Sequence, residues 1–98
     1  MFEKIEPVSI TARAAAEIKK IMEAKRIPPD HALRIGIRGG GCGATLIIGF
    51  DTLKETDQTY TIADIPVYIN KHHLMFLIGK EVDFYEGEEG RGFLFREG

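Results

Sequence analysis

The chain has 98 residues and a mass of 11.0 kDa, so we expect one small domain over residues 1–98. Thirteen basic and fifteen acidic residues give a formal net charge of −2, which argues against nucleic acid as a partner because phosphate binding uses clustered basic charge. No apolar run approaches the ~20 residues of a membrane span, and residues 1–8 lack the apolar stretch of a signal peptide, so we expect a cytoplasmic protein with no membrane partner.

The first half of the chain predicts a helix and two strands. Residues 11–25 carry apolar side chains at three- and four-residue spacing behind Thr11, a suitable N-cap, and the helix must end before Pro28. Residues 32–38 alternate apolar and other side chains, which predicts a strand, and the β-branched and apolar residues 44–50 predict a second one. We expect a glycine-rich loop at residues 39–43 to join them.

The second half predicts four further strands and a short helix. After a polar loop at 51–57, residues 58–62 and 66–69 predict two strands around a tight turn near Asp64. Residues 71–78 predict a short helix with Leu74, Leu77 and Ile78 facing inward. Residues 81–85 and 92–96 alternate around an acidic turn at 87–91, which predicts a hairpin. The expected fold class is mainly β with two helices (α+β), a compact β-rich domain.

The glycine loop carries the only cysteine, Cys42, so no disulfide can form within one chain and one chain cannot supply a multi-cysteine metal site. Four of the eleven glycines lie within residues 39–43, and glycine lets backbone amides approach a ligand closely. A concave set of amides stabilises phosphate, a thiolate or the sulfides of an iron–sulfur centre. A plain flexible turn around a buried cysteine fits the same residues, so both interpretations stay open.

Other candidate chemistries have weaker support. The glycine spacing in residues 39–44 formally fits a dinucleotide-binding fingerprint, but a strand-forming segment follows where that motif requires a helix. His72 and His73 are adjacent, and neighbours on a helix point about 100° apart, so at most one of them could reach a shared ion. A thiol enzyme that pairs Cys42 with one of these histidines is a third hypothesis.

The run from residue 33 to residue 43 resembles the signature of the A-type iron–sulfur carrier family, the HesB/IscA-like proteins, in which a strand leads into a glycine-flanked cysteine. Residues 74–79, 82–84 and 92–95 resemble the second half of that family in order and spacing. The resemblance implies dimers or tetramers and a non-enzymatic role in receiving and passing on iron or an iron–sulfur cluster. Of the family's three cysteines, only Cys42 has a counterpart here, because a C-terminal Cys-Gly-Cys motif is lacking.

On this basis we predict that Cys42 binds iron or an iron–sulfur cluster, that the backbone of Gly40, Gly41 and Gly43 surrounds it, and that His72 is a candidate additional ligand. A [2Fe–2S] centre requires four ligands. A homodimer would supply two thiolates, and glutathione, a partner's cysteines or His72 would supply the rest. The expected partners are iron–sulfur scaffold or recipient apoproteins. The alternative is a non-enzymatic interaction protein of the same fold that has lost cluster binding.

Overall fold

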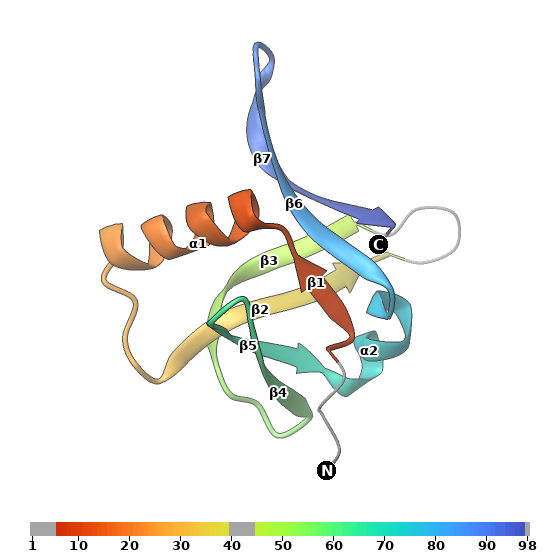
Figure 1. Ribbon diagram of the computed structural model, residues 1–98. Coiled ribbons are helices and arrows are strands. Elements are labelled where there is room, and N and C mark those ends of the chain that lie inside the picture. The colour runs from red at the N-terminus through yellow and green to blue at the C-terminus, as the bar shows by residue number, and fades with distance from the viewer. Residues whose placement is uncertain (1–5, 40–44, 98) are drawn as a thin grey trace.

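The computed structural model describes residues 6–39 and 45–97, which form two β-sheets and two helices (Figure 1). The elements are, in chain order, β1 (Val8–Ile10), α1 (Ala12–Ala24), β2 (His31–Arg38), β3 (Thr45–Thr52), β4 (Asp57–Ile62), β5 (Ile65–Asn70), α2 (Lys71–Leu77), β6 (Lys80–Gly87) and β7 (Gly90–Glu97). This content confirms the predicted fold class. Neither helix in the described part of the chain has the length and apolar character needed to span a membrane.

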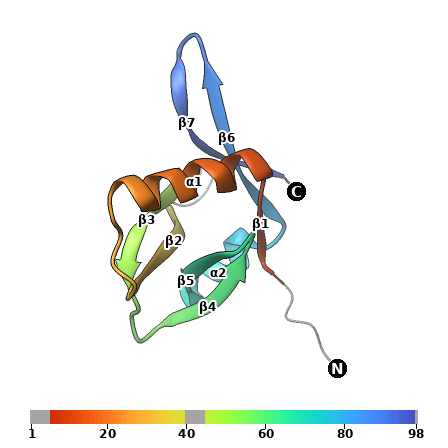
Figure 2. The same ribbon diagram turned by 60° about the vertical axis from the view of Figure 1, so that its left-hand side comes forward.

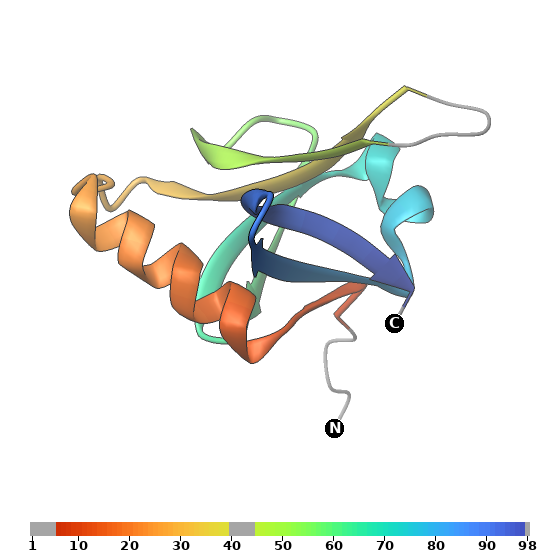
Figure 3. The ribbon, with the colours of Figure 1, turned by 90° about the horizontal axis from the view of Figure 1, so that it is seen from above.

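The two sheets have three and four strands, in the orders β1-β6-β7 and β3-β2-β5-β4. The longest strand pairing of the second sheet joins β2 and β3 antiparallel, while β5 runs parallel to β2 and meets it only at two residues, Leu33 and Arg34. In the view from above, α1 and the β6–β7 hairpin lie on the same side of β2 and β3 (Figure 3). One core joins these layers, with buried side chains from β1, α1, β2, β4, β5, α2 and β6.

Helix α1 forms where the apolar spacing predicts it. Thr11 is its N-cap and its hydroxyl accepts a hydrogen bond from the Ala14 amide, which satisfies one of the free amides of the first turn. Ala14, Ala15 and Ile18 are buried against the sheets. The helix ends at Ala24, before the prolines, as predicted.

Strand β2 is covered on both faces along part of its length. Leu33 and Ile35 are buried on the predicted apolar face, but Ala32 and Gly36 are buried as well. The ring of His73 from α2 lies against Gly36, which explains why this position of the other face is not exposed.

Two expectations about element boundaries are wrong, and one strand was missed. Strand β3 continues to Thr52, so its last two residues replace the start of the predicted loop at 51–57, because Asp51 pairs across from Ala32 in the β2–β3 ladder. Helix α2 ends at Leu77, and Ile78 adopts a non-helical conformation and is exposed rather than turned inward. The three-residue strand β1 was not predicted, because so short a segment shows no periodicity of its own.

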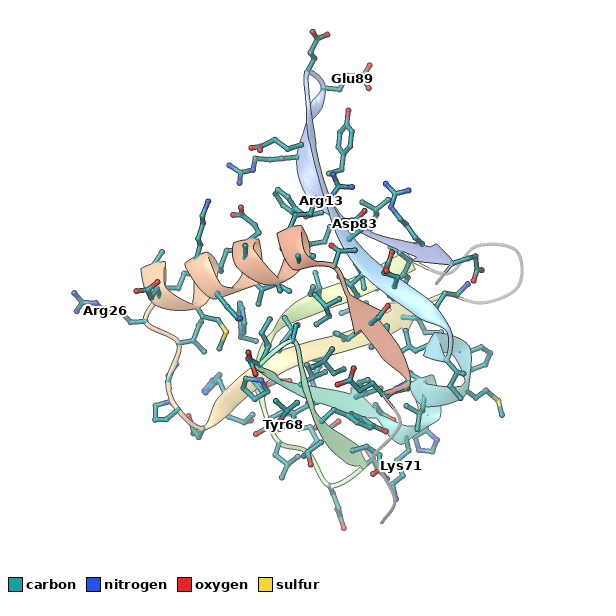
Figure 4. The ribbon with its side chains drawn as sticks, in the orientation of Figure 1. Arg13, Arg26, Tyr68, Lys71, Asp83 and Glu89 are labelled. Atoms are coloured by element: carbon teal, nitrogen blue, oxygen red, sulfur yellow. The ribbon has the colours of Figure 1, made fainter. Side chains whose placement is uncertain are left out.

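The predicted hairpin is confirmed and extends further toward its tip than expected, with β6 and β7 paired as far as Gly87 and Gly90. β1 pairs with β6 only up to Val82. Beyond that point the two strands continue as a twisted ribbon that projects from the body of the molecule (Figures 1 and 2). Its acidic tip, which includes Glu89 (Figure 4), is exposed to solvent, as expected for a solvated turn.

Candidate functional site

The paired ends of β2 and β3 frame the candidate loop. The antiparallel ladder closes at Arg38 opposite Thr45, and both residues are exposed. Gly39 leaves β2 with φ +84°, in the left-handed region that favours glycine because it has no Cβ. The remaining connection contains the predicted ligand Cys42 and the glycines at 40, 41 and 43, which lie outside the described residues. The predicted roles of those four residues therefore stay predictions.

Helix α2 braces β2 just before this loop. The Ile37 amide donates a hydrogen bond of 3.4 Å to Nδ1 of His73. A Cβ placed on Gly36 would lie only 2.8 Å from the same nitrogen, so the ring requires glycine at that position. Since β5 pairs with β2 only at residues 33 and 34, His73 supplies an acceptor to a β2 amide that no described strand reaches on that side.

The two adjacent histidines have different surroundings, as the helical geometry predicts. His73 is half-buried against β2, whereas His72 is exposed, and its backbone amide donates to the side-chain oxygen of Asn70, the N-cap of α2, at 2.8 Å. Within residues 6–39 and 45–97, no three His, Asp or Glu side chains gather closely enough to hold a metal ion. The role of His72 as an additional ligand stays a prediction.

A partly buried ion-pair network holds β2, β3 and β4 together. The Arg34 guanidinium donates to both carboxylate oxygens of Asp57, at 2.8 and 2.6 Å, and to Asp51 at 3.0 Å. These hydrogen bonds, chiefly those with Asp57, raise the pKa of Arg34, and the bonds from Arg34 lower the pKa of Asp57. The pKa of Asp51 is lowered mainly by the hydrogen bond from the Thr52 amide. The network fixes the strand that leads to the loop.

A second network surrounds Asp83 on β6, which is only 3% exposed. Its Oδ1 accepts from the Thr11 hydroxyl, the Arg13 Nε and the Phe84 amide, each at 2.8 Å. Its Oδ2 accepts from Arg13 Nη2 at 2.8 Å (Figure 4) and from Arg96 Nε at 2.6 Å. These bonds, led by those from Arg13 and then Thr11, hold the pKa of Asp83 far below its usual range. The Asp83 carboxylate thus connects the start of α1 to both strands of the hairpin through hydrogen bonds.

Neither network was predicted from the sequence. The alternation of β2 places Arg34 on the face opposite Leu33 and Ile35, but it does not identify acidic partners 17 and 23 positions away. Asp83 stands between Val82 and Phe84, and this position in an alternating strand predicts an exposed side chain. Each network depends on which elements the fold brings together.

Comparison with known proteins shows which family the chain resembles. The family described as iron-sulphur cluster biosynthesis matches residues 7–98. The iron-sulfur cluster insertion protein ErpA of Glaesserella parasuis serovar 5 is 34% identical over 97 residues, a stretch that covers 96% of this chain and 84% of that protein.

Two solved structures share the fold. A protein from Aquifex aeolicus, solved by solution NMR, is 30% identical with a TM-score of 0.72, and the match covers 100% of both chains. The crystal structure of IscA with the [2Fe-2S] cluster is 23% identical with a TM-score of 0.69, covering 92% of this chain and 81% of that one. The resemblance predicted from the sequence is thereby confirmed, as is the non-enzymatic character that it implied: the chain belongs to the iron-sulphur cluster biosynthesis family, with the HesB/IscA-like fold.

Proposed function

We propose that this protein binds iron or an iron–sulfur cluster through the thiolate of Cys42 and passes it to recipient apoproteins. The observation that carries the proposal is the position of the only cysteine. It stands in the short connection between Arg38 and Thr45, the exposed last pair of the β2–β3 ladder, in a chain whose family match spans residues 7–98. We expect a thiolate in such a connection to be accessible to a metal and to a second protein.

The chemistry of the loop supports this cargo over others. A soft thiolate prefers iron–sulfur clusters or zinc to magnesium or calcium. Glycines at 40, 41 and 43 have no side chain to keep their backbone amides from a sulfide or thiolate, and amides so placed would stabilise its negative charge. The relatives agree in kind, since one is named an iron-sulfur cluster insertion protein and another was crystallised with a [2Fe-2S] cluster.

The ligand count argues for a cluster shared between two copies. A [2Fe–2S] centre requires four ligands, and each chain supplies one, the Cys42 thiolate. A homodimer would provide two thiolates around its two-fold axis. Glutathione, His72 or cysteines of the recipient would complete the set. Such a site holds its cargo weakly, which suits transfer better than storage. The cytoplasmic location and the single-domain organisation stay predictions of the sequence.

Anaerobic reconstitution with ferrous iron, sulfide and dithiothreitol tests the proposal. We expect visible absorbance from sulfide-to-iron charge transfer and about two iron atoms per two chains. Cys42→Ser should abolish both, with an unchanged circular dichroism spectrum as the check on folding. His72→Ala should make the cluster shorter-lived, and His73→Asn, a change at the adjacent position that retains a hydrogen-bond acceptor for the Ile37 amide, should not.

Two results would separate this function from the alternatives. A wild-type protein that stays colourless and free of iron favours the interaction protein that has lost cluster binding. If the protein takes up no iron, a Cys42 that is alkylated rapidly well below pH 8 favours the thiol-enzyme hypothesis, because only a strongly activated thiol reacts there.

A further inference from the structure

The outer face of α2 exposes large apolar side chains. Met75 is 76% exposed, Phe76 57% and Ile78 65%, although the helix buries Leu77 on its other side. These three residues stand within four positions of one another, and they are most of the exposed large hydrophobic side chains in the described part of the chain. Exposed apolar side chains gathered in one segment of a small protein are typical of a surface that contacts a partner.

A lysine and a histidine share this face. Residues four apart on a helix are neighbours, so Lys71 lies beside Met75, and His72 lies beside Phe76. Lys71 is exposed at the periphery of the molecule (Figure 4) and has no ion-pair partner among the residues that the structure describes. The face that we call the α2 surface therefore combines one fixed positive charge, Lys71, with the apolar side chains Met75, Phe76 and Ile78.

The charge is not explained by the stability of the helix. The first turn of α2 contains no acidic residue, although the macrodipole favours negative charge at that end and disfavours the positive charge of Lys71. The helix also has no carboxylate of its own to pair with this lysine. Places where a sequence departs from local stability rules without a compensating contact are typically functional.

The apolar character continues past the end of the helix. A hollow of about 430 Å³ is lined by Leu74, Ile78 and residues of β1 and β4. Two charged residues also line it, Glu6 and Lys80, and Lys80 is already paired with Glu97 at 2.6 Å. A partner on the α2 surface could thus extend an apolar side chain into this hollow while its carboxylates face Lys71.

The α2 surface belongs to the same structural unit as the start of the loop. His73 of α2 accepts the hydrogen bond of the Ile37 amide, and Arg38, the last residue of β2, follows directly. A protein bound to the outer face of α2 would therefore be held by an element that is braced against the strand leading to Cys42. A recipient has to approach Cys42, so a docking site on an element connected to this strand suits a recipient better than it suits a partner that has no need to approach Cys42.

We propose that the α2 surface docks the recipient apoprotein, through a contact surface that combines carboxylates with apolar side chains. The identity of the partner as a recipient rests on the proposed function. A second copy of this chain fits the surface less well, because a pair of α2 helices would bring two Lys71 charges together and neither helix carries a carboxylate, whereas an acidic partner complements Lys71.

Binding of a defined acidic recipient tests the docking without any cluster. The probe is a plant-type [2Fe–2S] apo-ferredoxin, titrated into the unloaded, isotope-labelled protein and followed by amide NMR. We expect perturbations centred on residues 71–78. The double variant Met75→Ser/Phe76→Ser should weaken binding at least tenfold, and Lys71→Glu should do the same while reducing the loss of affinity between 50 and 200 mM salt.

Matched controls lie elsewhere on the surface. Leu53→Ser removes another exposed apolar side chain, in the β3–β4 connection, and Lys25→Glu reverses a charge at the end of α1. Both should bind within twofold of the wild type. Perturbations centred on other elements, no detectable binding, or an equal effect of Leu53→Ser would overturn the proposal, as would a dimer that Phe76→Ser dissociates.

A second stage separates this inference from the proposed function. After reconstitution, Met75→Ser/Phe76→Ser should carry the same absorbance as the wild type but transfer its cluster to apo-ferredoxin at a tenth of the rate or less. A loaded variant that transfers at the wild-type rate contradicts the docking role and leaves cluster binding intact. A wild type that never loads contradicts the proposed function, while the NMR titration still decides whether the α2 surface binds.

Discussion

The contact between Gly36 and His73 allows a sharp test of how α2 is held against β2. A methyl group at position 36 would lie 2.8 Å from His73 Nδ1 and 3.3 Å from Cε1. Gly36→Ala therefore forces the ring to move, at about 1–3 kcal/mol for overpacking. It also weakens the bond from the Ile37 amide, which is worth roughly 1 kcal/mol. Alanine loses less backbone conformational entropy than glycine when the strand folds, and this difference offsets about 0.5–1 kcal/mol of the destabilisation.

We expect a net loss of about 2 kcal/mol from Gly36→Ala, or a fall in melting temperature of roughly 8–16 °C for a domain of this size. The measurement is urea unfolding of four proteins: the wild type, Gly36→Ala, His73→Ala and the double variant. Since His73→Ala removes the clashing ring, Gly36→Ala should be neutral or stabilising in that background, which gives a coupling energy of about 2 kcal/mol. If Gly36→Ala destabilises both backgrounds equally, the close approach of the ring is not the cause.

Two further predictions concern the buried carboxylates. Because the pKa of Asp83 is depressed in the folded protein, its ionised form stabilises the fold at neutral pH, and this contribution falls as the pH drops below the unfolded value of about 4 toward the folded pKa. Asp83→Asn should therefore lower the urea midpoint at pH 7, with the gap to the wild type narrowing at pH 3; a gap that does not change with pH would contradict this. Arg34→Met should cost about 3 kcal/mol of unfolding free energy, because it leaves the Asp57 carboxylate, whose side chain is fully buried, without its charged partner. Adding Asp57→Leu should recover much of that loss in the same urea assay, and a double variant no more stable than Arg34→Met would refute the argument.

The two proposals assign different roles to the Cys42 thiolate and to the α2 surface. Cys42 would carry the cargo, and the α2 surface would position the protein that receives it. Their tests are independent, because binding of apo-ferredoxin needs no cluster and cluster formation needs no recipient. If only the docking succeeds, the protein is an interaction partner of the family fold that has lost its cargo, which is the alternative that the sequence left open.

Much of the secondary structure followed from local patterns. The apolar spacing that follows Thr11 predicted α1. The positive φ angles at Ala63 and Asp64 occur where the turn between β4 and β5 was expected. Periodicity did not predict β1, because a strand of three residues is too short to show an alternating pattern. It also placed Ile78 in α2, although the helix ends one residue earlier. The glycine loop could be recognised as a candidate site because glycine and cysteine are rare enough to stand out together.

The sequence by itself determined most of the segments that become helices and strands, that the chain has one thiol, and which family it resembles. Only the tertiary structure decided that Asp83 is buried beneath two arginines, that Arg34 joins three strands, and that His73 rather than His72 lies against β2. The reason is physical. Hydrophobic periodicity reports how a residue faces within its own element, whereas partners 13 to 72 positions apart meet only through the register and topology of the sheets.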